Sequence, residues 1–159
     1  MKKSYLLWFP LFLLALCNLG SCSEEGEGVE NVIEYSQLPE EAKTFLDQYF
    51  YNIEVTKVIK ETYSDMVIYQ VSLENGIAID FNEDGIWTQV DAPFGKTIPT
   101  GFIPQPIMQS LNYNYNGYGI NQINREGENY HIVLTNNQGG DSIDLIYNQS
   151  GEIVNQGTV

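Results

Sequence analysis

Basic side chains, histidine and cysteine are all scarce in this sequence. Its 159 residues include seven Lys or Arg, one His and two Cys against 21 Asp or Glu, and the formal net charge is −14. A single histidine cannot build a His-rich metal site. Nucleic acids and anionic headgroups attract basic patches, which a chain this acidic does not favour. We therefore expect no nucleic-acid partner and no cofactor.

A long hydrophobic run is also missing. The apolar segment Leu6 to Leu16 follows two lysines and is shorter than the ~20 residues that a transmembrane helix needs. This pattern is typical of a secretory signal peptide. The Leu-Gly-Ser-Cys segment that ends at Cys22 resembles a bacterial lipobox, in which the cysteine thiol receives a diacylglycerol. We predict a lipoprotein signal peptide over residues 1–21 and lipid attachment at Cys22, which anchors the protein to a membrane; an ordinary signal peptide with a spare cysteine is the alternative.

The cysteines offer no disulfide once the leader is removed. Cys17 leaves with the signal peptide and lipidated Cys22 cannot pair, which excludes a disulfide framework. The following segment, residues 22–35, begins acidic and glycine-rich, and we predict a flexible tether there. Its acidic start also resembles the signal that sends some lipoproteins of Bacteroides-type bacteria to the cell surface. We expect a lipid-anchored, surface-exposed protein of the outer membrane, with the periplasmic face as the alternative.

Residues 36–92 have the pattern of one helix followed by four strands. The helix is expected to begin at Leu38-Pro39, with Ser36 or Gln37 at the cap, because proline is tolerated at the first helical position. Alternating apolar runs broken by Asn-Gly and Asp-Gly predict a hairpin ladder, since these pairs accept the positive φ of tight turns. The expected strands are 53–63, 66–73, 77–81 and 86–90. A break in alternation at residues 55–59 predicts a bulge.

The same signals return over residues 96–155. Ile98-Pro99 matches Leu38-Pro39, residues 130–134 match 69–73, and 143–147 match 77–81. We interpret this as an internal duplication. The predicted fold class is α+β: a tandem repeat of a helix plus a four-stranded antiparallel meander, together one compact domain. With both helices on one face of the sheet, the other face would meet solvent, as antiparallel sheets allow.

This repeated pattern resembles a known family. The order Leu-Pro, amphipathic helix, Tyr-x-Val-x-Leu, Asn-Gly and Ile-x-Phe-x-x-x-Gly is similar to that of the PepSY-like, β-lactamase-inhibitor-like lipoproteins of Bacteroides-type bacteria, over residues 36–155. The resemblance implies a fold similar to the β-lactamase inhibitor protein, whose concave sheet grips a partner enzyme. It does not imply that this chain inhibits a β-lactamase. The second copy departs from the pattern, because its central turn at residues 136–141 lacks Asn-Gly.

One segment resembles a calcium loop. Asp80, Asn82 and Asp84 take positions 1, 3 and 5 of an EF-hand pattern, with glycine at position 6 and Asp91 at position 12. The residues before Asp80 alternate as a strand, whereas an EF-hand loop needs an entering helix there. The matching turn at residues 148–151 also has no carboxylate. We therefore predict a hairpin turn and no metal, with calcium binding as the alternative.

The sequence offers no arrangement typical of catalysis. A catalytic triad around His131 would have to recruit Ser72 or Ser142, and neither lies in a nucleophile-elbow pattern. Asp141 and Asp144 fit turn solubility better than acid/base work. No glycine-rich phosphate loop is present. We predict that the protein is not an enzyme.

The function is therefore expected to lie in a surface. Alternation places several apolar side chains on the face that the helices leave open, namely Met66, Ile68, Ala78, Trp87, Val133 and Ile146. A cluster of exposed apolar groups indicates a contact site, and Trp87 is the expected anchor. We predict an inhibitor-like protein that binds a protein partner through this face. The alternative is that these side chains form a second small core under residues 29–35.

A tyrosine-rich loop over residues 112–119 supports a different function. Tyr113, Tyr115 and Tyr118 alternate with Asn and Gly, a composition typical of adaptable recognition surfaces. Such residues stack on sugar rings and bind their hydroxyls. The alternative function is an accessory glycan-binding lipoprotein; a structural alternative is that Tyr113 and Tyr118 pack against the second helix.

Overall fold

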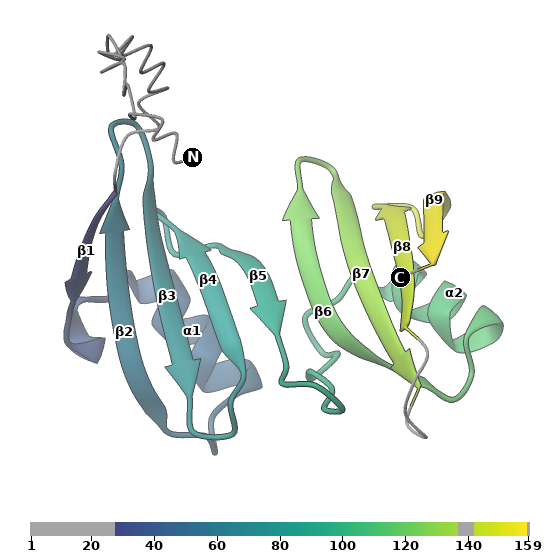
Figure 1. Cartoon of the computed structure of the whole chain (residues 1–159), viewed down its shortest axis with the longest axis horizontal. Helices are drawn as coiled ribbons and strands as arrows, with labels where there is room; N and C mark the ends of the chain where they lie inside the picture. Colours follow the sequence, from purple (N-terminus) through teal and green to yellow (C-terminus); the bar gives the residue numbers. More distant parts are fainter. Residues whose placement is uncertain (1–27, 137–141, 159) are drawn as a thin grey trace, which may run out of the picture.

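The computed structural model describes residues 28–136 and 142–158. In this part of the chain, nine antiparallel strands form one sheet and two ten-residue α-helices accompany it (Figure 1). The strands lie side by side in the order in which they occur in the sequence, from β1 to β9. Each strand therefore pairs with its neighbours in the chain, and the fold is an extended meander.

The elements fall into two halves. The first half contains β1 (Val29–Val32), the 3-10 helix η1 (Tyr35–Gln37), α1 (Glu40–Tyr49), β2 (Val55–Thr62), β3 (Val67–Leu73), β4 (Ala78–Asn82) and β5 (Trp87–Asp91). The second half contains α2 (Gln105–Asn114), β6 (Tyr118–Glu126), β7 (Asn129–Asn136), β8 (Ser142–Asn148) and β9 (Ile153–Thr158). The predicted helix and four strands of each half are present.

Both helices start directly after a proline. Pro39 is the N-cap of α1 and Pro104 is the N-cap of α2. The first helix thus begins close to where the sequence predicts, although Pro39 caps it and neither Ser36 nor Gln37 does; these two residues belong to η1. The second helix begins late in the chain, as Pro104 and Pro106 predict, and its N-cap is Pro104 rather than Pro99, which the sequence pattern matches with Pro39.

Residues 29–32 extend the sheet at its edge. Strand β1 pairs antiparallel with β2, from Val29 opposite Thr62 to Val32 opposite Ile59. The predicted tether over 22–35 is therefore wrong for its described part, which is ordered by backbone pairing. The alternative in which residues 29–35 cover a second small core is also wrong, since β1 lies beside β2 and its side chains are exposed.

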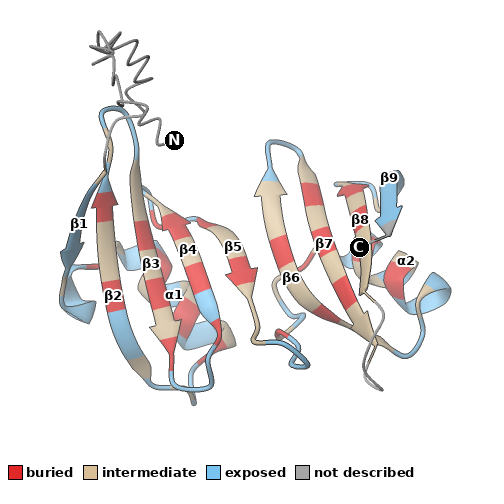
Figure 2. Cartoon of the chain, in the orientation of Figure 1, coloured by how far each residue is buried: buried red, intermediate tan, exposed pale blue. Residues whose placement is uncertain are grey.

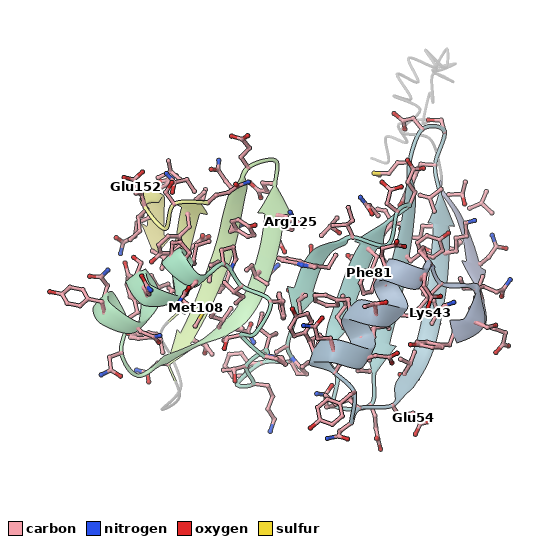
Figure 3. The ribbon with its side chains drawn as sticks, turned by 180° about the vertical axis from the view of Figure 1, so that it is seen from behind. Lys43, Glu54, Phe81, Met108, Arg125 and Glu152 are labelled. Carbon is pink, nitrogen blue, oxygen red and sulfur yellow. The ribbon has the colours of Figure 1, made fainter. Side chains whose placement is uncertain are left out.

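One buried core contains residues of both helices and of the strands. Apolar side chains at alternate positions along β3, β4 and the turn between them are buried (Figure 2), namely Tyr69, Val71, Leu73, Ile77, Ile79 and Phe81. Phe45 of α1 contacts Phe81 at 5.7 Å between ring centroids. Ser110 of α2 lies 3.4 Å from the Tyr147 hydroxyl. Figure 3, seen from behind, brings both helices in front of the strands.

The two halves share a continuous core. Phe102, in the segment between β5 and α2, packs against Phe45 and Trp87, each at 5.1 Å between ring centroids. The side-chain amide of Asn121 donates to the carbonyls of Ala92 and Pro93 and to that of Lys96. These contacts fix the connecting segment against β6, so the halves form one unit.

Register shifts bend the sheet at four places. One lies in β2 at Val55/Lys57, which confirms the bulge expected there. The others are at Asp80/Phe81 against β5, at Ile120/Gln122 in β6, and at Ile146/Tyr147 against β9. Since a bulge adds one residue to one strand, it changes which side chains face the core from that point on.

Candidate functional site: a polar sheet face

The side of the sheet opposite Phe81 and Tyr147 carries two rows of directly paired residues, which we call the front face. The first row crosses eight strands and contains Ile59, Gln70, Asp80, Gln89, Asn124, His131, Ile146 and Asn155. The second contains Lys57, Ser72, Ala78, Asp91, Gln122, Val133, Asp144 and Gly157. Polar or charged side chains are the majority in both rows, so the front face is polar rather than apolar.

Trp87 does not lie on the front face, and this prediction is wrong. Its side chain is 9% exposed and packs against Phe45 and Phe102, with ring centroids 6.1 and 5.1 Å away. The Arg125 guanidinium covers its ring at 5.1 Å, on the side of the sheet that Figure 3 shows. The cause is the bulge between β4 and β5, which adds a residue in β5, pairs Trp87 with Phe81 and so turns Trp87 to the core.

The other predicted contact residues do not form one patch. Val133 and Ile146 are diagonal neighbours on β7 and β8 of the front face, both half-buried. Ile68 faces the same side on β3, opposite Glu61 and Asn82. Met66 is exposed in the turn before β3. The structure thus brings together one apolar pair within a polar surface.

A histidine-carboxylate group lies beside this apolar pair. Nε2 of His131 is 2.5 Å from Oδ1 of Asp144, and its Nδ1 is 3.7 Å from Oε1 of Glu126. His131 is directly opposite Ile146, and Asp144 is opposite Val133. The sequence identified His131 as a single imidazole, but only strand register could show which carboxylates it contacts.

The first half of the front face gathers three carboxylates. Burial, followed by the charges of Asp91 and Glu61, raises the pKa of Asp80 from 3.8 to about 6. Asp91 accepts a hydrogen bond from the Gln89 side chain. Glu61 is buried and accepts the Tyr63 hydroxyl at 3.0 Å. The proximity of like charges in a partly desolvated position makes ionised Asp80 unfavourable.

Replacing Asp80 by asparagine should therefore stabilise the protein at neutral pH. Well below the ordinary pKa of 3.8 the carboxyl is protonated in both states. As the pH rises towards 6, the carboxyl of the unfolded chain loses its proton first, so the native state loses stability. After allowance for partial solvent screening, we expect Asp80→Asn to raise the free energy of unfolding by about 1–2 kcal/mol at pH 7 and by little at pH 4. Urea denaturation between pH 4 and 8 measures this. As a control, Asp84→Asn at an exposed position should leave the pH dependence of the unfolding free energy as in wild type. If Asp80→Asn also kept the wild-type pH dependence, the raised pKa of Asp80 would be contradicted.

The segment that resembles a calcium loop is a hairpin turn, as predicted. Asn82 accepts the backbone N–H groups of Asp84 and Ile86 on its Oδ1, at 3.1 and 2.9 Å, and its backbone carbonyl accepts the N–H of Gly85 at 3.0 Å. Asn148 forms the equivalent turn with Ser150 and Glu152, at 3.0 Å each. Over residues 28–136 and 142–158, no three His, Cys, Asp or Glu side chains gather closely enough to hold a metal ion.

The tyrosine-rich segment is more regular than predicted. α2 continues to Asn114, so Tyr113 is an exposed helical residue and Tyr115 is the C-cap. Tyr118 begins β6 and packs, with Tyr115, against the core. The prediction of a long mobile loop over residues 112–119 is therefore wrong. The structural alternative, packing against the second helix, is wrong for Tyr113, which is exposed; Tyr118 packs against the core, which includes Ile107 and Leu111 of α2.

Three solved structures share this fold. A protein of the DUF2874 family from Bacteroides vulgatus, described as putative periplasmic, is 24% identical with a TM-score of 0.72; the match covers 80% of this chain and 96% of that one. One from Bacteroides thetaiotaomicron, described as a putative calcium-regulated periplasmic protein, is 23% identical with a TM-score of 0.73, covering 80% and 96%. A second from Bacteroides vulgatus, described as a putative periplasmic protein of unknown function, is 27% identical with a TM-score of 0.71, covering 81% and 99%.

Sequence comparison adds a family. No curated protein matches this sequence. Neither helix of the described part has the length and hydropathy to cross a membrane. The family model described as "Putative beta-lactamase-inhibitor-like, PepSY-like" matches residues 67–155, from the start of β3 into β9. Because this match spans more than half of the chain, the protein belongs to the PepSY-like, β-lactamase-inhibitor-like family, as its repeated sequence pattern indicates.

Proposed function

We propose that the protein is a non-enzymatic component of the bacterial cell envelope that binds a protein partner through its front face. The observation that carries this proposal is the pair of residue rows across eight strands, over which no described helix or strand lies. Lipid anchorage through Cys22, on the outer membrane and facing either the surface or the periplasm, is part of the proposal; Cys22 lies outside the described residues. The periplasmic descriptions of the three relatives support an envelope location.

The placement of both helices supports an open front face. α1 packs on the Phe81 side and α2 on the Tyr147 side of the sheet, and these two residues share one face. We infer that the halves are repeats: the helices start at residues 40 and 105, and bulges follow at 55/57 and 120/122. Each repeat then covers the same side of the sheet with its helix and leaves the other side available.

The front face has the chemical character of an interface. Val133 and Ile146 supply an apolar centre, and the contact between His131 and Asp144 fixes polar groups beside it. On the neighbouring strand β6, the side-chain amide of Gln122 donates a hydrogen bond to Oδ1 of Asn124 at 3.5 Å. Side chains held in place before binding lose less conformational entropy when a partner docks, and an apolar centre with a polar rim is typical of recognition surfaces.

The same geometry argues against catalysis. His131 has carboxylates at both ring nitrogens, Asp144 at Nε2 and Glu126 at Nδ1. Nucleophilic catalysis requires a hydroxyl or thiol at one nitrogen and an orienting group at the other. The imidazole is therefore arranged to hold two acidic side chains on the front face.

Site-specific photo-crosslinking in cells tests the proposal. A photoreactive residue replaces Ile146 on the front face or, as the matched control, exposed Tyr113 on α2. We expect a discrete crosslinked protein at position 146 that is lost when Val133→Arg is added, because the new charge disrupts the apolar centre. No crosslink at position 146, or the same product at position 113, would contradict partner binding by this face.

A glycan-binding function is the second candidate, favoured by one cavity. A space of about 260 Å³ at the end of α2 is lined by Tyr115 and Tyr118 together with Asn112 and Asn116. Aromatic rings next to amides can stack on a sugar and bind its hydroxyls. A glycan array with wild type and Tyr118→Ala tests this function; a blank array for wild type would remove it.

A further inference from the structure

Each half of the protein contains a cavity at the C-terminal end of its helix. The α1 cavity has a volume of about 320 Å³ and lies between the end of α1 and the starts of β2 and η1. The α2 cavity, of about 260 Å³, lies between the end of α2 and the start of β6. The α1 cavity is at the lower end of the volumes that ligand sites show and the α2 cavity is just below it, so each suits a single side chain or a small molecule.

The two cavities are equivalent in position. An offset of 65 residues converts seven of the eight residues that line the α1 cavity, all except Leu73, into residues that line the α2 cavity. For the apolar lining, Leu46, Phe50 and Val55 correspond to Leu111, Tyr115 and Ile120. The same offset relates α1 to α2 and the bulge of β2 to that of β6. The two cavities thus occupy equivalent positions in the two halves, although most of the residues that line them differ in type.

Their exposed polar residues differ. Tyr35, Asp47 and Tyr51 of the α1 cavity correspond to Thr100, Asn112 and Asn116 of the α2 cavity. One cavity therefore has a carboxylate and two aromatic rings where the other has neutral, non-aromatic side chains. Tyrosine faces and a carboxylate both attract organic cations, whereas amides carry no net charge.

The surroundings of Asp47 are electronegative. The Tyr35 hydroxyl lies 3.5 Å from Oδ1 of Asp47, and burial, Asp47 and Glu40 together raise the pKa of Tyr35. Lys43 pairs with Glu40 at 3.3 Å, and no described basic side chain pairs with Asp47. The last turn of α1 contains no basic residue, so the negative end of the helix dipole is also uncompensated there.

We propose that the α1 cavity binds an organic cation carried on an apolar stem. The stem would lie on buried Leu46, Phe50 and Leu73, and the cation would contact the Asp47 carboxylate beside the rings of Tyr35 and Tyr51. A free amine and a lysine side chain of a polypeptide share this chemistry. The site is separate from the front face and does not depend on partner binding there.

NMR titration of the purified protein with phenethylammonium tests the proposal. We expect amide shifts confined to residues 46–55 and 73, with a dissociation constant on the order of 1 mM. The neutral analogue 2-phenylethanol should bind more weakly. A lysine-containing tripeptide tests the source of the cation: tighter binding than the free amine indicates a polypeptide ligand, and weaker binding indicates a small amine.

The equivalent cavity supplies matched variants. Asp47→Asn installs the residue found at Asn112 and should weaken cation binding about tenfold or more, because a charge-assisted contact is lost; binding of 2-phenylethanol should not change. Asn112→Asp should create cation-dependent shifts at residues 111–120. Asp47 and Asn112 are exposed, so neither variant should disturb folding. Equal affinity of wild type and Asp47→Asn for phenethylammonium, or wild-type shifts outside the α1 cavity, would overturn the proposal.

Discussion

Replacing Trp87 with alanine should lower the free energy of unfolding by about 3–5 kcal/mol. The indole is buried where the two halves meet, in contact with Phe45, Phe102 and Tyr130. Truncation leaves a cavity between α1 and the sheet and removes the ring that the Arg125 guanidinium covers. Equilibrium denaturation in urea, monitored by circular dichroism, measures the loss.

A surface control separates this effect from a general one. Met66→Ala, at a side chain that is 49% exposed, should change stability by less than about 0.5 kcal/mol. A loss below 1 kcal/mol for Trp87→Ala would contradict its burial and return Trp87 to the solvent-exposed position that simple alternation predicts.

Replacing Gly151 with alanine should lower the free energy of unfolding by a similar amount, about 3 kcal/mol. Gly151 has a φ of +80°, which costs an L residue roughly 1–2 kcal/mol. An added Cβ would also lie 2.6 Å from the carbonyl carbon and oxygen of Pro106, and relief of such a clash typically adds about 1–3 kcal/mol. The turn after β8 thus packs against the start of α2 with no room for a methyl group.

Gly127 provides the matched control. Its φ is +62°, but a Cβ there would meet no atom within 4 Å. Gly127→Ala should therefore show the backbone cost alone, about 1–2 kcal/mol. Urea denaturation of Gly151→Ala and Gly127→Ala compares their losses of stability, and the difference measures the cost of the close approach of Gly151 to Pro106. Equal losses for the two variants would contradict that close approach. Gly85 has the same relation to α1, with a Cβ position 2.7 Å from Pro39 and 2.9 Å from the Ala42 nitrogen.

The sequence was most informative where turn signals bound short alternating strands. Tyr69, Val71 and Leu73 alternate before Asn75-Gly76, and the structure buries all three. In such a hairpin the tight turn sets the register, and the period of two then assigns every side chain to a face. The Pro39 signal likewise located α1, because proline restricts where a helix can begin.

Bulges limited what could be predicted of the site. The sequence predicts the bulge in β2 but not the one between β4 and β5, so regular alternation through β5 places Trp87 on the wrong face. The polar rows of the front face depend on the register across β5 and β6, where Gln89 pairs with Asn124. That pairing joins residues separated by a long connection and has no local signal in the sequence.

The second helix shows tertiary packing overriding local preference. Asn112, Tyr113 and Asn114 have weak helix propensity, which predicts a loop, yet α2 includes all three. Burial of Ile107 and Leu111 against the sheet holds the helix, since most helical stability in proteins comes from such packing. Ile98-Pro99 resembles Leu38-Pro39 in sequence but does not precede a helix. The same apolar-proline pair recurs five residues later as Ile103-Pro104, and α2 begins there.

Solvent paramagnetic relaxation of methyl groups in the whole chain tests the open front face most directly. With a soluble gadolinium chelate, the methyl groups of Val133 and Ile146 should relax much faster than those of Ile132 and Leu145, which point into the core from the same strands. Equal protection of all four residues would mean that another part of the chain covers the front face, and would contradict its role as the binding surface.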